Sequence, residues 1–147
     1  MLNLNTNYSM MNINNRNNAT AFKGKQEVAI AKKILNEVEF APSKKPELNF
    51  DDISNAFKTA YEKLKTAFIE HGLVANELPS ELNTSKTGMD MIAIKSTDNH
   101  PIGLISRGVK ENTASISYHD VLDKRNLKVT LTDEKGALSI TSLDEKI

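Results

Sequence analysis

The sequence predicts an α+β protein in which two amphipathic helices pack on one face of a five-stranded antiparallel meander sheet. Two observations predict this fold. Apolar residues recur with the 3.6-residue period of a helix up to about residue 73, and from Met89 onward they alternate with polar residues. Such alternation is typical of an antiparallel sheet with one face in water, so the apolar face can receive the helices.

The chain has 147 residues, which is enough for one domain with a tail. Its N-terminal part is rich in asparagine, whose side chain competes with regular backbone hydrogen bonding, and it offers little apolar surface. We therefore expect residues 1–24 to form a disordered tail and residues 25–147 to form a single α+β domain. Helices are expected at about 25–38 and 49–71, and strands within about 89–142.

A short amphipathic helix is predicted from Lys25 to Val38. Its apolar stripe consists of Val28, Ala31, Ile34, Leu35 and Val38. Residues 41–46 contain two prolines, which interrupt both helices and strand ladders, so this segment is predicted to be a linker.

The second helix carries the stronger pattern. Asn49 is a suitable N-cap, and Gly72 suits the left-handed position after the last turn, where Leu73 can fold back on the helix. At 100° per residue one face consists of Phe50, Ile53, Ala56, Phe57, Ala60, Leu64, Ala67 and Phe68, with Tyr61 at its edge. This helix needs a hydrophobic partner.

The predicted sheet supplies that partner. Residues 74–88 are expected to be a polar connection, after which five short strands follow one another. Alternation predicts an apolar face made of Ile92, Ile94, Ile102, Leu104, Ile116, Val129, Leu131, Leu138 and Ile140.

The composition excludes several classes of protein. Lys+Arg and Asp+Glu are both 19, so net charge gives no reason to expect a nucleic acid or an anionic membrane as partner. Arg107, Lys128 and Lys95 on the polar face are too few, and lack the aromatic residues of a nucleic-acid surface. Cysteine is absent, which excludes disulfides and thiol chemistry. No apolar run spans a bilayer and the N-terminus lacks the features of a secretory signal, so we expect a cytoplasmic location and no membrane partner.

Catalytic and metal-binding motifs are weak. His119 and Asp120, at the end of the third predicted strand, are the most suggestive pair because both residue types bind metals. A metal site needs three or four converging ligands, and no other His or carboxylate recurs at a diagnostic spacing. We therefore expect no metal, no cofactor and no catalytic residues.

The most plausible binding surface is the polar face of the sheet, at Ser115, Ser117, His119, Lys128 and Thr130. The sequence favours a small, non-enzymatic protein-binding or adaptor module that could form a homodimer, because the meander must leave a strand edge open for pairing. Two alternatives remain open. One is a ligand-binding protein or metal-dependent enzyme that uses the polar face around His119, and the other is a structural or exported assembly component.

Overall fold

The computed structural model of this chain describes residues 13–38, 50–79, 87–110, 112–134 and 137–147. Two helices and six strands lie within these residues. In chain order they are α1 (Ile13–Asn36), α2 (Phe50–Glu70), β1 (Val74–Leu78), β2 (Thr87–Lys95), β3 (Pro101–Lys110), β4 (Thr113–Asp120), β5 (Arg125–Glu134) and β6 (Ala137–Lys146). The strands form one antiparallel sheet in the order β1-β2-β3-β4-β5-β6, which confirms the α+β class.

The predicted count of five strands is wrong, because the segment after α2 forms a sixth. β1 pairs with β2 from Val74 opposite Lys95 to Leu78 opposite Met91. Four of its five residues are exposed, so the sequence shows no alternation there. Backbone pairing with a single neighbour holds this edge strand, and that interaction leaves little trace in a hydropathy pattern.

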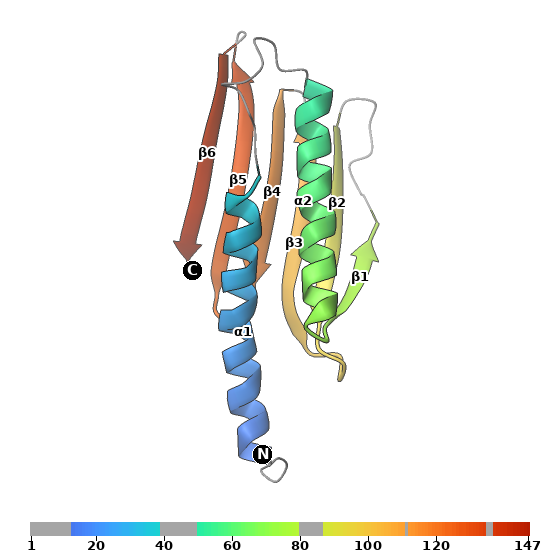
Figure 1. The fold of residues 1–147 in the computed structure, drawn as a ribbon, viewed down its shortest axis with the longest axis vertical. Coiled ribbons are helices and arrows are strands. Elements are labelled where there is room, and N and C mark those ends of the chain that lie inside the picture. The colour runs from blue at the N-terminus through green and yellow to red at the C-terminus, as the bar shows by residue number, and fades with distance from the viewer. Residues whose placement is uncertain (1–12, 39–49, 80–86, 111, 135–136) are drawn as a thin grey trace.

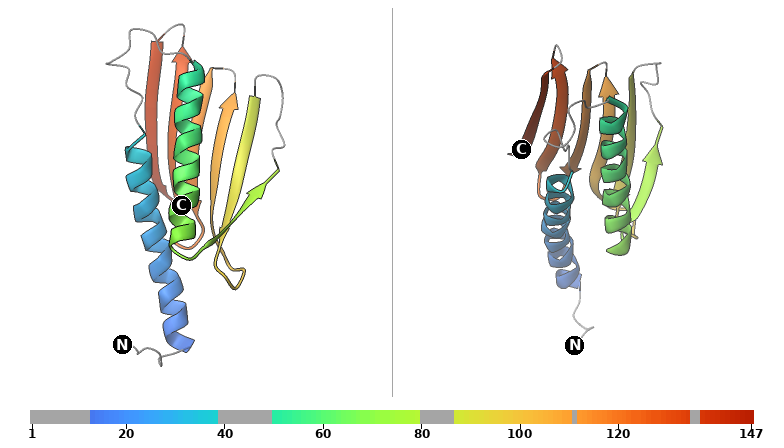
Figure 2. Two further views of the ribbon diagram at one scale, coloured as in Figure 1. Left: turned by 45° about the vertical axis from the view of Figure 1, so that its right-hand side comes forward. Right: turned by 45° about the horizontal axis from the view of Figure 1, so that its top comes forward.

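Helices and sheet form two layers. Figures 1 and 2 show both helices on the same side of the sheet, where α2 packs against β1, β3 and β4 and α1 packs against β4, β5 and α2. The core lies between the layers, and Phe57, Leu64 and Phe68 of α2 are completely buried in it. Burying each of these side chains contributes roughly 1.5–3 kcal/mol before conformational entropy is subtracted.

The C-terminus of α2 has the geometry that its sequence predicts. The Leu73 N–H donates to the Phe68 carbonyl at 3.1 Å, and the Gly72 N–H donates to the Ile69 carbonyl at 2.9 Å. Gly72 has φ of +81°, so these bonds form a Schellman motif. Leu73 is consequently folded back into the core and buried.

Helix α1 begins at Ile13 rather than at Lys25, so it includes residues that the sequence assigned to the tail. Once a helix is nucleated, each further residue is added at low cost, which allows it to continue through a segment of weak helix formers. Its first turns, drawn in blue, extend past the end of the sheet (Figures 1 and 2). Residues 1–12, the rest of the predicted tail, lie outside the described residues.

A bulge in β3 overturns part of the predicted apolar face. Ile94 lies opposite Gly103 while Lys95 lies opposite Pro101, so Ile102 has no partner in the ladder. The extra residue shifts the alternation by one position. Beyond the bulge Ile105 is therefore buried, whereas Leu104, the predicted core residue, is only half-buried on the opposite face.

The predicted core residues of β2, β4 and β5 are buried, whereas Ile140 of β6 is exposed. Pairing places Ile140 opposite the buried Leu131, on the helix side of the sheet. Ile140 nevertheless keeps 46% of its surface exposed, because α1 lies over β4 and β5 while β6 forms the edge (Figure 1). The Leu138 side chain lies outside the described residues.

Candidate functional site

Pairing of β4 with β5 brings the predicted surface residues together. Ser115 lies opposite Thr130 and Ser117 lies opposite Lys128, with His119 two residues further along β4. The residues that alternate with them along β4, Ala114, Ile116 and Tyr118, are buried beneath the helices. The five predicted residues therefore share the face of the sheet that is turned away from the helices, hereafter the outer face.

The outer face carries hydroxyl groups on neighbouring strands. Ser117 Oγ lies 2.6 Å from Ser106 Oγ of β3, which ties the two strands together. His119 and Asp120 point to opposite faces because they are neighbours in a strand, so the predicted His–Asp pair does not converge. Among the described residues, no group of three His, Asp or Glu side chains could hold a metal ion.

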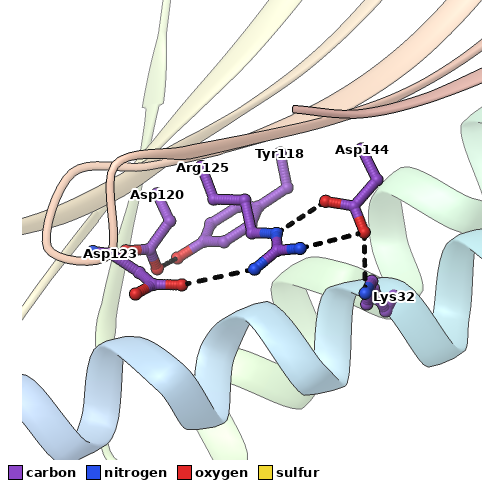
Figure 3. Close-up of polar contacts among 6 residues, drawn as sticks. All are labelled: Lys32, Tyr118, Asp120, Asp123, Arg125 and Asp144. Carbon is purple, nitrogen blue, oxygen red and sulfur yellow. Dashed lines mark hydrogen bonds and ion pairs between the residues drawn. The ribbon is translucent and has the colours of Figure 1, made fainter. Parts of the chain in front are cut away.

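Asp120 instead belongs to a buried polar cluster that the sequence did not reveal. The Tyr118 hydroxyl donates to Asp120 Oδ2 at 2.7 Å, and the Asp123 N–H donates to Asp120 Oδ1 at 2.5 Å (Figure 3). Burial raises the pKa of the Asp120 carboxyl, although these two hydrogen bonds act in the opposite direction. Burial, the hydrogen bond to Asp120 and the charges of Asp120 and Glu27 raise the pKa of Tyr118 far above its usual value.

This cluster serves the fold. Glu27 of α1 is almost completely buried, and the Tyr118 ring packs on Phe68 of α2 with a centroid distance of 5.0 Å. Asp120 holds the turn between β4 and β5 through the Asp123 N–H. The pair of Tyr118 and Asp120 therefore fixes the end of β4 against α2. The only sign of it in the sequence was the alternation that predicts an inward Tyr118.

An ion-pair network beside the cluster connects α1 with the two last strands (Figure 3). Arg125 Nε donates to Asp144 Oδ1 at 2.6 Å, and Lys32 Nζ lies 2.7 Å from Asp144 Oδ2. Asp123 Oδ2 lies 4.0 Å from Arg125 Nη1. The hydrogen bonds from Arg125 and Lys32 lower the pKa of Asp144, and the network joins β6 to both β5 and α1.

Arg107 is not on the outer face, where the sequence placed it. The bulge at Ile102 turns it to the helix side, and it forms an ion pair with Asp90 while its guanidinium lies 5.3 Å from the Tyr61 ring centroid. Burial, aided by the charge of Glu77, raises the pKa of Tyr61 to about 12. Arg107 therefore packs against α2.

Grooves lie next to α1. One, of about 480 Å³, runs between the helices and is lined by Ile34, Glu37, Val38, Ala56, Thr59, Ala60 and Lys63. Another, of about 120 Å³, separates α1 from the last two strands and includes Lys32, Asn36, Ser142 and Asp144 in its lining. Their walls combine aliphatic side chains with a few charged groups.

The β6 edge is the most exposed part of the sheet. Every residue from Ser139 to Ile147 is exposed. Ile140 and Leu143, on opposite faces of the strand, keep 46% and 43% of their surfaces in solvent. An exposed strand edge that also carries large apolar side chains is typical of a surface that pairs with another chain.

In the part of the chain that the structure describes, no helix is long and apolar enough to cross a membrane. Comparison of the chain with family models, curated proteins and solved structures finds no match. Fold and surface together define an α+β protein with a six-stranded meander that is covered on one face and open along β6.

Proposed function

We propose that this chain is a small, non-enzymatic protein-binding module whose binding element is the open edge of β6. The observation that carries the proposal is the combination of length, regularity and exposure in this edge strand. β6 has ten residues without a proline, and it pairs with β5 without a register shift. Natural edge strands are usually shortened, bulged or protected by charge. The part of β6 from Ala137 to Leu143 has no charged residue, so this part of the edge favours a partner.

One hydrogen bond identifies which N–H and C=O groups of β6 point away from β5. The Ile147 N–H donates to the Lys124 carbonyl at 2.7 Å, continuing the ladder in which Lys146 lies opposite Arg125. In an antiparallel pair such bonded positions alternate with positions whose N–H and C=O point away from the neighbour. Backbone groups that point away from β5 therefore belong to Leu138, Ile140, Ser142, Asp144 and Lys146.

The opposite edge is less suited to this role. β1 has only five residues, and one of its side chains, Glu77, is held by an ion pair with Lys65 of α2. A strand that adds to an edge gains main-chain hydrogen bonds in proportion to the length it pairs with, so β6 provides the larger site.

A peptide-display experiment tests the proposal. Peptides selected from a random display library on the intact protein should protect the Ile140 and Ser142 amides from hydrogen exchange. Ser142→Pro removes an outward N–H without removing a bond to β5, so it should abolish binding, while the matched Ser142→Ala should retain it. If the chain is monomeric and no peptide binds, or if the selected peptides protect other segments and bind Ser142→Pro normally, the proposal is wrong.

A ligand site on the outer face is the second candidate, because β4 and β5 gather Ser115, Ser117, His119, Lys128 and Thr130 on one surface. A thermal-shift screen with divalent metals and nucleotides tests it, since a ligand that binds the folded state raises Tm. A shift that His119→Ala abolishes would support this candidate. We further propose a cytoplasmic location, without a nucleic-acid or membrane partner, on the basis of the balanced charge and the absence of cysteine.

A further inference from the structure

We infer that the occupant of the β6 edge is a second copy of this chain, paired antiparallel about a two-fold axis that passes through Ile140. This inference rests on the proposed role of the β6 edge and specifies its partner. Three properties of β6 carry it: the position of its charges, the direction of its free backbone groups and the exposure of its apolar side chains.

The charges of β6 select an antiparallel arrangement. Asp144, Glu145 and Lys146 are at one end of the strand, while the segment from Ala137 to Leu143 is uncharged. In a parallel pair, the acidic residues Asp144 and Glu145 of the two copies would lie side by side, and like charges in that position are destabilising. Antiparallel pairing instead places the charged end of each copy at the uncharged end of its partner.

The free backbone groups restrict the register. Outward groups belong to the even-numbered positions, so these positions must lie opposite one another for both copies to form N–H···O bonds. With the axis at Ile140, Ile140 lies opposite its own copy and Leu138 lies opposite Ser142. Even-numbered positions also share the helix side of the sheet, so the helices of both copies lie on the same side of one continuous sheet.

The side chains distinguish this register from the next ones along the strand. An axis at Thr141 also keeps even-numbered positions opposite one another, but it would place Leu138 opposite Asp144. An axis at Ser142 would place Ile140 opposite Asp144 and Leu138 opposite Lys146, so both registers match apolar residues with charged ones. An axis at Ile140 brings the two exposed Ile140 side chains together on the helix side and places Leu143 opposite Ala137 on the outer face. Ile140 and Leu143 then each lie opposite an uncharged residue.

Charge-swap variants at the axis test the inference by size-exclusion chromatography with light scattering. The wild-type chain should elute with the mass of two chains. Ile140→Lys and Ile140→Glu alone should each elute with the mass of one chain, because two like charges would lie directly opposite each other. An equimolar mixture of the two variants should recover the mass of two chains. Ile69→Lys, at an exposed position of α2, is the matched control and should remain dimeric.

Ile140 is exposed at the edge, so its substitution should leave the fold intact, and an unchanged Tm by circular dichroism verifies this. A wild-type chain that is monomeric at every concentration overturns the inference, as does an Ile140→Lys variant that remains dimeric or a mixture that stays monomeric. If the chain is monomeric while selected peptides still protect Ile140 and Ser142, the edge binds a different protein: the self-pairing is then wrong and the proposed function stands. If neither occurs, both are wrong.

Discussion

Tyr118 lies directly over Gly103 on the neighbouring strand. A Cβ atom at residue 103 would lie 2.6 Å from both Cε1 and the hydroxyl oxygen of Tyr118, and 2.8 Å from the His119 carbonyl oxygen. Gly103 follows the bulge in β3 and pairs with Asp120, whose carboxylate accepts a hydrogen bond from the Tyr118 hydroxyl. The absence of a side chain at residue 103 thus makes room for the buried hydrogen bond that fixes the end of β4.

Gly103→Ala should therefore destabilise the protein by about 1–3 kcal/mol, because the added methyl group overpacks the site against a ring and a backbone atom. The free energy of unfolding in urea measures this loss. Gly108→Ala in the same strand is the control, since its added Cβ would meet nothing closer than 3.7 Å. That variant should stay within about 0.5 kcal/mol of wild type. Equal losses in both variants would contradict the close approach of Tyr118 to Gly103.

The packing of α2 on the sheet gives a second prediction. Leu64 is completely buried, so Leu64→Ala should reduce the free energy of unfolding by about 2–5 kcal/mol through lost burial and the cavity that remains. Ile69 lies on the exposed side of the same helix, so Ile69→Ala should change stability by no more than about 0.5 kcal/mol. Urea unfolding of both variants provides the comparison, and a small loss for Leu64→Ala would show that the helix does not pack as described.

Asp144 should stabilise the protein at neutral pH and lose this effect in acid. Its hydrogen bonds with Arg125 and Lys32 lower its pKa in the folded state. Its contribution is therefore present above the pKa of the unfolded chain and disappears as the pH falls through the lower, folded-state pKa. Urea unfolding of wild type and Asp144→Asn should show the largest difference at neutral pH. The difference should also shrink in high salt, because the network is partly exposed.

The contribution of Asp120 to stability should show the opposite dependence on pH. Burial raises its pKa in the folded state, so its contribution is most favourable below the pKa of the unfolded chain and is lost as the pH rises through the folded-state pKa. The stability of wild type relative to Asp120→Asn should therefore fall from acid to neutral pH. Urea unfolding across this range measures the trend, and a relative stability that rises with pH would show that the hydrogen bonds from Tyr118 and Asp123 outweigh burial.

Much of the fold could be predicted because periodicity depends on burial. The stripe of α2, its Schellman motif and the inward residues of β4 and β5 agree with the structure, since each of these elements has one face in the core. The candidate surface from Ser115 to Thr130 could be placed on one face for the same reason. β1 could not be predicted, because it is short, four of its five residues are exposed, and apolar and polar residues do not alternate along it.

Other features depend on contacts between segments that are distant in the sequence. One unpaired residue, Ile102, exchanges the faces of Leu104, Ile105 and Arg107, and only the pairing of β3 with β2 reveals it. The buried cluster around Asp120 was missed because Asp120 was weighed only together with His119 as a metal ligand, whereas a strand turns these adjacent residues to opposite faces.

The sequence alone determined that an amphipathic helix lies on the apolar side of an antiparallel meander, because local periodicity records which side of each element avoids water. Tertiary structure alone decided the sixth strand, the bulge and the exposed edge of β6. These features depend on backbone hydrogen bonds between strands and on the width of the helix layer relative to the sheet. The hydropathy of a single segment indicates neither of them.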